Sequence, residues 1–148
     1  MELKELYKEI ILDHGKNPRN KGKCKDFNYD ASGHNPLCGD KVHIFVKLSK
    51  DDKVEDLSFE GEGCAISLAS ASILTDIIKN KNIVIANKIT EDFLKMIKNN
   101  SKITLNSLNE DQKTTMMSLS GVKDFPMRVK CATMAWHTLT SALEKKND

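Results

Sequence analysis

The chain has 148 residues, a formal net charge of +2, and only five Phe, two Tyr and one Trp. This length suits a single domain over residues 1–148, and the balanced charge with few aromatic residues argues against nucleic-acid binding. The N-terminus has no apolar leader, and no stretch approaches the ~20 apolar residues of a membrane span. We therefore expect a cytoplasmic protein that does not associate with membranes.

An amphipathic helix is predicted over residues 3–14, with charged residues opposite Leu6, Ile10 and Ile11. Pro18 lies in the cluster of turn-forming residues that ends this helix. The loop that follows is basic, which favours a solvated face over a docking patch. Its cationic residues are Lys16, Arg19, Lys21, Lys23 and Lys25.

Three strands are predicted next. A short strand is expected over residues 27–31, and residues 42–48 alternate apolar and polar side chains except at Phe45. After a polar turn, residues 54–63 read as the returning strand of a hairpin. Antiparallel strands with one apolar face need a cover, and the rest of the chain has the periodicity of helices.

The helical part begins at residues 64–80, which are apolar nearly all the way round and should be buried on most sides. A second helix is predicted with Thr90 as its N-cap, and a third with Ser107 and Glu110 in capping-box register. The last helix should start near residue 127 and bury Met134, Leu139 and Leu143. Strands followed by helices predict an α+β domain, a three-stranded antiparallel sheet covered by helices.

The cysteines are the main candidates for chemistry. In a reducing compartment, widely separated cysteines indicate a metal, catalysis or ordinary burial in preference to disulfides. Cys38, Cys64 and Cys131 lie near the ends of predicted elements, where loops gather and side chains can converge. Cys24 has no neighbouring glycine or acid, and we interpret it as incidental.

A metal site is one interpretation of this pattern. If a strand starts at Asp40, its side chain and that of Cys38 point to the same side, because side chains alternate along a strand. Together with Cys64 and Cys131 they would offer three sulfurs and one oxygen, a set that suits tetrahedral Zn²⁺. Thiolates also suit iron–sulfur clusters, so the donors alone do not select the metal. Without a CxxC pair, ordinary buried cysteines are the commoner explanation of such spacing.

Three stretches, "NPLCGD", "FEGEGCAISLASAS" and "RVKCATMAW", resemble the cysteine motifs of the U-type iron–sulfur assembly family (IscU, SufU and NifU N-terminal proteins). "LYKEIILDHGKNPRNKG" is similar to the family's N-terminal helix and loop, so the resemblance covers about residues 6–140. IscU-type members place a histidine where this chain has Lys130. The 66 residues between Cys64 and Cys131 also leave room for an extra helical segment around residues 103–120, which SufU-type members carry. Both features resemble the SufU type.

This resemblance implies a zinc-dependent sulfurtransferase of iron–sulfur cluster biogenesis. It would accept persulfide sulfur from a SufS-type cysteine desulfurase and pass it to downstream iron–sulfur assembly proteins. Cys38 matches the sulfur acceptor, and Asp40, Cys64 and Cys131 match the other zinc ligands. Arg128 matches a basic position that supports a persulfide or thiolate, which we weigh equally with pairing to a local carboxylate. The alternatives are a scaffold for a transient [2Fe–2S] cluster and a non-catalytic, zinc-stabilised adaptor.

Overall fold

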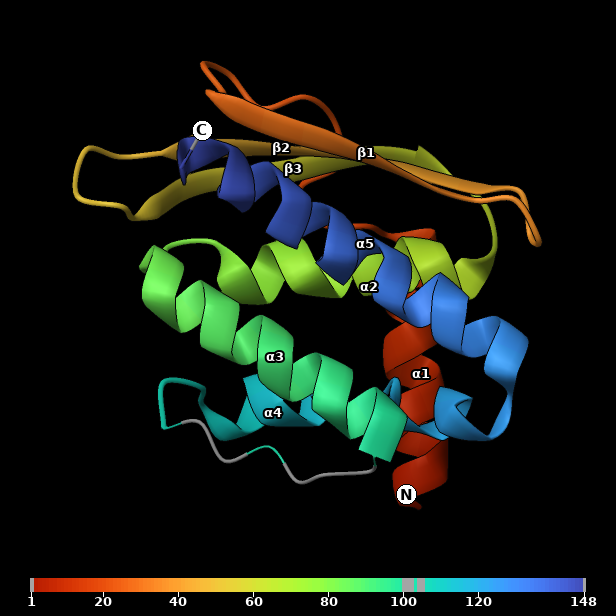
Figure 1. Ribbon diagram of the computed structural model, residues 1–148. Helices are drawn as coiled ribbons and strands as arrows, with labels where there is room; N and C mark the ends of the chain where they lie inside the picture. Colours follow the sequence, from red (N-terminus) through yellow and green to blue (C-terminus); the bar gives the residue numbers. More distant parts are fainter. Residues whose placement is uncertain (1, 100–102, 104–105, 148) are drawn as a thin grey trace.

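The computed structural model describes residues 2–99, 103 and 106–147 (Figure 1). Its elements form one sheet and a set of helices, which confirms the predicted α+β class. In chain order they are α1 (Leu3–Lys16), β1 (Tyr29–Asn35), β2 (Asp40–Leu48), β3 (Val54–Glu62), α2 (Ala65–Ile78), α3 (Ile83–Asn99), α4 (Glu110–Met117), the 3-10 helix η1 (Ser120–Asp124), α5 (Pro126–Glu144) and the 3-10 helix η2 (Lys145–Asn147).

The sheet is antiparallel with strand order β1-β2-β3. On its covered face Ile44 of β2 pairs with Phe59 of β3, and both are fully buried. The first strand is longer than predicted and runs to Asn35, which pairs with Asp40 across a short turn. The predicted strand is present, but its expected bounds of residues 27–31 were wrong because this strand has few apolar residues to mark them. Its extent depends on pairing with β2, which its own periodicity does not reveal.

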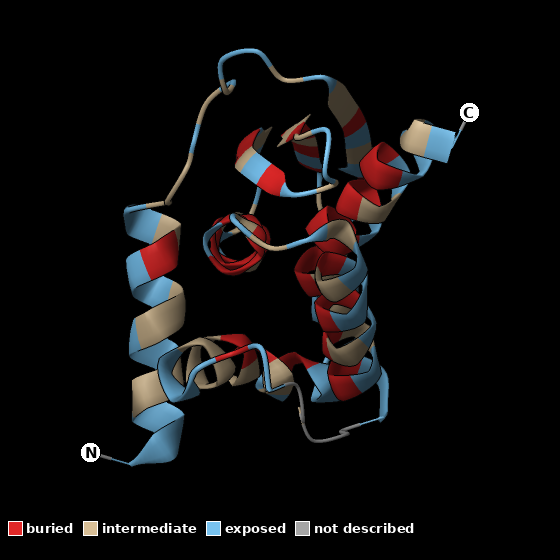
Figure 2. Ribbon diagram, turned by 90° about the vertical axis from the view of Figure 1, so that its left-hand side faces the viewer, coloured by how far each residue is buried: buried red, intermediate tan, exposed pale blue. Residues whose placement is uncertain are grey.

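Helices α2 and α5 lie under the sheet, and α3 follows beneath α5 (Figure 1). The indole of Trp136 on α5 stacks on Phe93 of α3 with ring centroids 4.0 Å apart. Its Nε1 donates to Ser70 Oγ of α2 at 2.9 Å, so one side chain joins three helices. Figure 2 shows buried residues gathered on the helices under the sheet, whereas α1 carries mostly exposed and half-buried residues.

The start of α3 differs from the prediction. The helix begins at Ile83, after Asn82, whose Oδ1 accepts the backbone N–H of Val84 at 2.8 Å. Thr90 is buried inside the helix, where its hydroxyl donates to the carbonyl of Ala86 at 2.9 Å, so the predicted N-cap at Thr90 is wrong. Over the helices of residues 2–99 and 106–147, none combines the length and the hydropathy needed to cross a bilayer.

The start of α4 also differs. A capping box joins Asn109 and Gln112, each side chain accepting the other residue's backbone N–H at 2.8 Å and 3.0 Å. The prediction placed this box two residues earlier, at Ser107 and Glu110, and was wrong. Both pairs have the same spacing, and asparagine is at least as good an N-cap as serine. The extra helical segment predicted around residues 103–120 contains α4, although residues 104–105 lie outside the described part.

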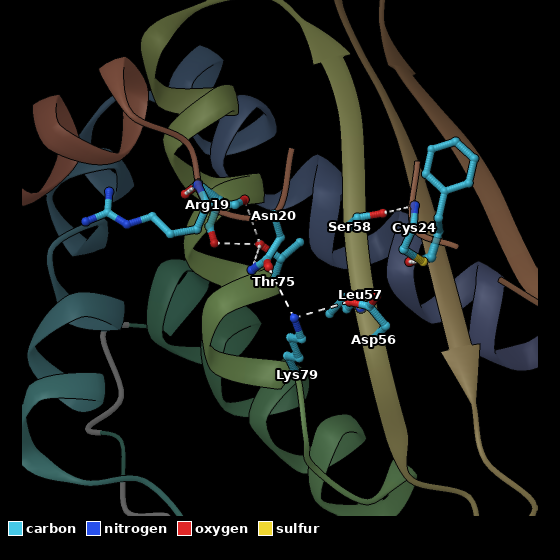
Figure 3. A network of polar contacts seen from close by, with 10 residues as sticks. Arg19, Asn20, Cys24, Asp56, Leu57, Ser58, Thr75 and Lys79 are labelled. Atoms are coloured by element: carbon cyan, nitrogen blue, oxygen red, sulfur yellow. Dashed lines mark hydrogen bonds and ion pairs between the residues drawn. The ribbon is translucent and has the colours of Figure 1, made fainter. Parts of the chain in front are cut away.

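The basic loop after α1 is held along the free edge of β3 (Figure 3). Asn20 accepts the backbone N–H of Phe59 at 3.0 Å, and its side chain donates to Thr75 of α2 at 3.3 Å. Lys79 forms an ion pair with Asp56 at 3.3 Å beside this contact. The loop therefore covers a sheet edge, which would otherwise offer unpaired backbone groups. Four of its lysines remain exposed, as predicted: Lys16, Lys21, Lys23 and Lys25.

Candidate metal centre

Two segments distant in sequence meet at one end of the sheet, on the right in Figure 1. Cys38 lies in the turn between β1 and β2, Asp40 is the first residue of β2, and Cys131 lies in the second turn of α5. One donor atom from each of these residues lies within 4.8 Å of the other two. Asp40 and Cys131 are fully buried, whereas Cys38 is half-buried. The Cys38 thiol is therefore the more accessible sulfur of this group.

The turn brings Cys38 and Asp40 together by a route that differs from the prediction. Because β2 begins at Asp40, strand alternation does not relate the two side chains. Between them Gly39 has a φ of +71°, a left-handed conformation that glycine adopts without a steric penalty. The expected convergence is thus present, but a left-handed turn produces it.

Asp40 is held by groups from two other elements. Its Oδ1 accepts the backbone N–H of Cys64 at 2.9 Å, and its Oδ2 accepts Asn35 Nδ2 at 3.5 Å. Gly63 makes the first contact possible, because a Cβ there would lie 2.2 Å from the same Oδ1. Its φ of +146° also favours glycine. The carboxylate thus reaches the N-terminus of α2, where free N–H groups favour an anion.

Cys64 is the N-cap residue of α2, and its Sγ accepts the N–H of Ser67 at 3.5 Å. It falls outside the group of three mutually close donors, although its thiol contacts that of Cys131. The structure therefore brings all four predicted ligands to one place, with Cys64 at the margin. Their role as metal ligands stays a prediction.

Burial is the main reason why the pKa of the Cys131 thiol is raised far above its ordinary value. Contacts with the side chains of Asp40, Cys64 and Cys38 act in the same direction. These neighbours are acceptors or potential anions that crowd one point, and a cation there would offset their mutual repulsion. The donor set of sulfur and oxygen atoms is one that Zn²⁺ accepts, so the residues fit that ion.

Arg128 brings positive charge to the same point. The charge of Cys64, followed by a hydrogen bond to Cys131, raises the pKa of the exposed Arg128 guanidinium. The ion pairs found among residues 2–99 and 106–147 include none between Arg128 and a carboxylate. Of the two interpretations of this residue, contact with the thiols therefore has the structural support.

Asn35 is a site residue that the sequence reasoning missed. It is buried, and its Nδ2 lies 3.9 Å from Cys131 Sγ as well as 3.5 Å from Asp40 Oδ2. Its Oδ1 accepts the N–H of Leu37 at 3.3 Å, which shapes the turn that carries Cys38. The signal was the Asn-Pro pair before the cysteine, because asparagine side chains often hydrogen-bond to the backbone two residues later.

Cys24 lies apart from this group, over the opposite face of the sheet. Its N–H donates to Ser58 Oγ at 2.8 Å, and its Sγ lies 3.8 Å from the carbonyl oxygen of Phe45 (Figure 3). Burial raises the pKa of this thiol. Its surroundings agree with the interpretation of Cys24 as incidental.

Comparison with known proteins agrees with this arrangement. Residues 6–132 match the family described as NifU-like N-terminal domain. The chain is 42% identical over 147 residues to the zinc-dependent sulfurtransferase SufU of Bacillus subtilis, covering 97% of this chain and 93% of that protein. It is 35% identical over 144 residues to the iron–sulfur cluster assembly scaffold protein IscU of Streptococcus pyogenes, covering 97% and 86% of the two chains.

The solved structures that resemble this chain include proteins with the same family descriptions. A crystal structure described as a putative iron–sulfur cluster assembly scaffold protein for the SUF system, from Fervidobacterium islandicum, has a TM-score of 0.80 and 32% identity. The match covers 91% of this chain and 94% of that chain. The N-terminal NifU-like protein of Brucella abortus shares the fold, with a TM-score of 0.83 at 19% identity. The chain belongs to the NifU-like N-terminal domain family, the U-type proteins of iron–sulfur assembly.

Proposed function

We propose that this protein is a zinc-dependent sulfurtransferase of iron–sulfur cluster biogenesis that accepts persulfide sulfur from a SufS-type cysteine desulfurase. The observation that carries the proposal is the asymmetry of the cysteine group: Cys38 is half-buried beside Asp40 and Cys131, which are fully buried. A partner protein can reach the Cys38 thiol in its turn, whereas the Cys131 thiol is buried and the half-buried Cys64 caps α2. The similar SufU protein of Bacillus subtilis is named for this activity.

Four residues would hold the zinc ion: Cys38, Asp40, Cys64 and Cys131. A bound Zn²⁺ would keep the cysteine ligands as thiolates at neutral pH. Asp40 is oriented by the Cys64 N–H and by Asn35, which correspond to the outer contacts that position ligands in metal sites. Their hydrogen bonds make the carboxylate the most firmly oriented of the donors.

In the transfer step the Cys38 thiolate attacks the terminal sulfur of the desulfurase persulfide. A new sulfur–sulfur bond forms on Cys38 while the bond to the desulfurase cysteine breaks, and that cysteine leaves as a thiolate. The exchange involves no net oxidation, because one persulfide replaces another. Arg128, whose guanidinium lies beside the thiols, would stabilise the persulfide anion on Cys38. The sulfur then passes to downstream iron–sulfur assembly proteins.

The test starts with metal and acid-labile sulfide analysis of protein purified without oxygen, where we expect about one zinc per chain and no sulfide. The protein is then incubated with the desulfurase and ³⁵S-cysteine, and label on the chain is measured under non-reducing conditions. Cys38→Ser should carry no label, whereas the control Cys24→Ser should be labelled like the wild type. Labelling of Cys38→Ser at the native rate would refute the assignment.

A scaffold for a transient [2Fe–2S] cluster is the second candidate. Similar proteins named as IscU scaffolds, from Streptococcus pyogenes and Thermotoga maritima, favour it. The same cysteines would then hold iron, because thiolates are the ordinary ligands of such clusters. Iron with matching acid-labile sulfide in the purified protein would select this candidate over the zinc-dependent one.

A further inference from the structure

A groove lies beside the cysteine group, between α3, η1 and α5. Its main part is a cavity of about 630 Å³ with an apolar floor that includes Leu94, Ile97 and Val129. A second hollow of about 330 Å³ adjoins it and extends to the turn between β1 and β2. Lys130, Thr133 and His137 of α5 line both hollows. We call the two together the α3–α5 groove.

The charged side chains of this groove share one sign. Lys98, Lys123 and Lys130 line its main part, and none of the residues found to line either hollow is acidic. No ion pair formed by the described residues uses any of these three lysines. Beyond His137 the charge of the lining changes, because Glu91 and Glu144 line the next hollow. Lys130 thus lines the part nearest the cysteines, while Lys98 and Lys123 line only the main part.

The groove runs up to the proposed sulfur acceptor. Lys130, which lines both hollows, directly precedes Cys131, and Leu37, which lines the second hollow, directly precedes Cys38. Leu37 is 62% exposed, so an apolar side chain faces solvent beside the accepting thiol. A protein that brings a persulfide to Cys38 from this side must cover the second hollow. The main part of the groove is continuous with that contact surface.

We propose that the α3–α5 groove binds an acidic, amphipathic segment of the protein that donates sulfur to Cys38. The proposal rests on the proposed function and adds an anchoring surface to it. Apolar side chains of the segment would pack on the floor, and its carboxylates would face Lys98, Lys123 and Lys130. Because Lys98 and Lys123 are not among the proposed metal ligands, they would affect docking of the donor and not the exchange of sulfur.

The experiment compares two double variants in the labelled-sulfur assay with the desulfurase as the varied component. Lys98→Glu/Lys123→Glu reverses two groove charges, and Lys88→Glu/Lys95→Glu makes the same change in net charge on exposed positions outside the groove. We expect the groove variant to raise the KM for the desulfurase about tenfold with unchanged kcat. The KM of the control variant should stay near that of the wild type. Added salt should reduce the difference in KM between the groove variant and the wild type, because it screens the charges. Thermal unfolding of each variant checks that it is folded.

Each other outcome has a definite meaning. If the wild type takes up no label, the proposed function fails before the groove is tested. If the wild type is labelled and both double variants share its KM, the groove proposal is wrong while the sulfurtransferase stands. The groove proposal is equally overturned if the groove variant only slows release of sulfur to an acceptor protein. A change in oligomeric state alone would assign the groove to a second copy and also refute it.

Discussion

The contact between Gly63 and Asp40 gives the sharpest prediction. In Gly63→Ala the new Cβ would lie 2.2 Å from Asp40 Oδ1 and 2.9 Å from Ser67 Oγ, at a φ of +146°. The backbone strain costs about 1–2 kcal/mol. Displacing the buried carboxylate from the Cys64 N–H costs a further ~1–3 kcal/mol, because a buried charged group loses its partner. We expect a total loss of about 2–5 kcal/mol in the free energy of unfolding.

Two other glycines separate these contributions. Gly22 has a φ of +122°, and no atom lies within 4 Å of the position that a Cβ would take, so Gly22→Ala should show the backbone strain alone. Gly121 has open space and no positive φ, so Gly121→Ala should change stability little. Urea unfolding of the metal-free proteins measures the stability of all three alanine variants, and competition with a chelator measures their zinc affinity. The reasoning is refuted if Gly63→Ala and Gly22→Ala lose the same stability and bind zinc equally well.

Two further predictions concern Asn35 and His14. Asn35→Ala removes a hydrogen bond from Asp40 and should weaken zinc binding about tenfold in chelator competition, with little change in circular dichroism. For His14, burial and then the charge of Arg19 lower the pKa, against smaller opposite effects of Asp76 and Asp13. The unfolded state therefore binds more protons, and stability should fall as the pH drops below about 6.5. Urea unfolding between pH 5 and 8 tests this, and a His14→Gln variant with the same dependence would contradict it.

The sequence was sufficient for the fold where local periodicity and tertiary packing agree. The alternation of β2 and the apolar surface of α2 led to the correct elements, because both are buried as their patterns predict. The prediction failed at Thr90, since a threonine before acids resembles an N-cap while burial of Ile89 and Phe93 keeps the helix running through it. Capping signals are weaker than the burial of an apolar face, so such a conflict is decided by packing.

The candidate site was predictable in its members but not in its construction. Glycines and an acid beside cysteines at element ends indicated which residues would meet. The left-handed turn at Gly39 could not be inferred because it depends on the register in which β1 pairs with β2. The reach of Asp40 to the N-terminus of α2 depends on how that helix packs beside the sheet. The Asn-Pro pair marks Asn35 as a turn residue, but not as a contact of the cysteine group. Its contact with Cys131 joins β1 to α5, and nothing local in the sequence marks that pair.

The contacts of the four donors explain why Cys38 in particular would carry sulfur. Asp40 accepts two hydrogen bonds, Cys64 Sγ accepts the Ser67 N–H, and Cys131 Sγ contacts both Asn35 and the carbonyl of Met127. The sulfur–backbone hydrogen bonds of the described residues involve Cys24, Cys64 and Cys131, and not Cys38, whose side chain contacts Cys131. A donor that makes no hydrogen bond to the backbone loses the fewest contacts when it leaves the group. Under the proposed function, its place in an exposed turn would let Cys38 meet a partner, while the three supported donors would hold the site together.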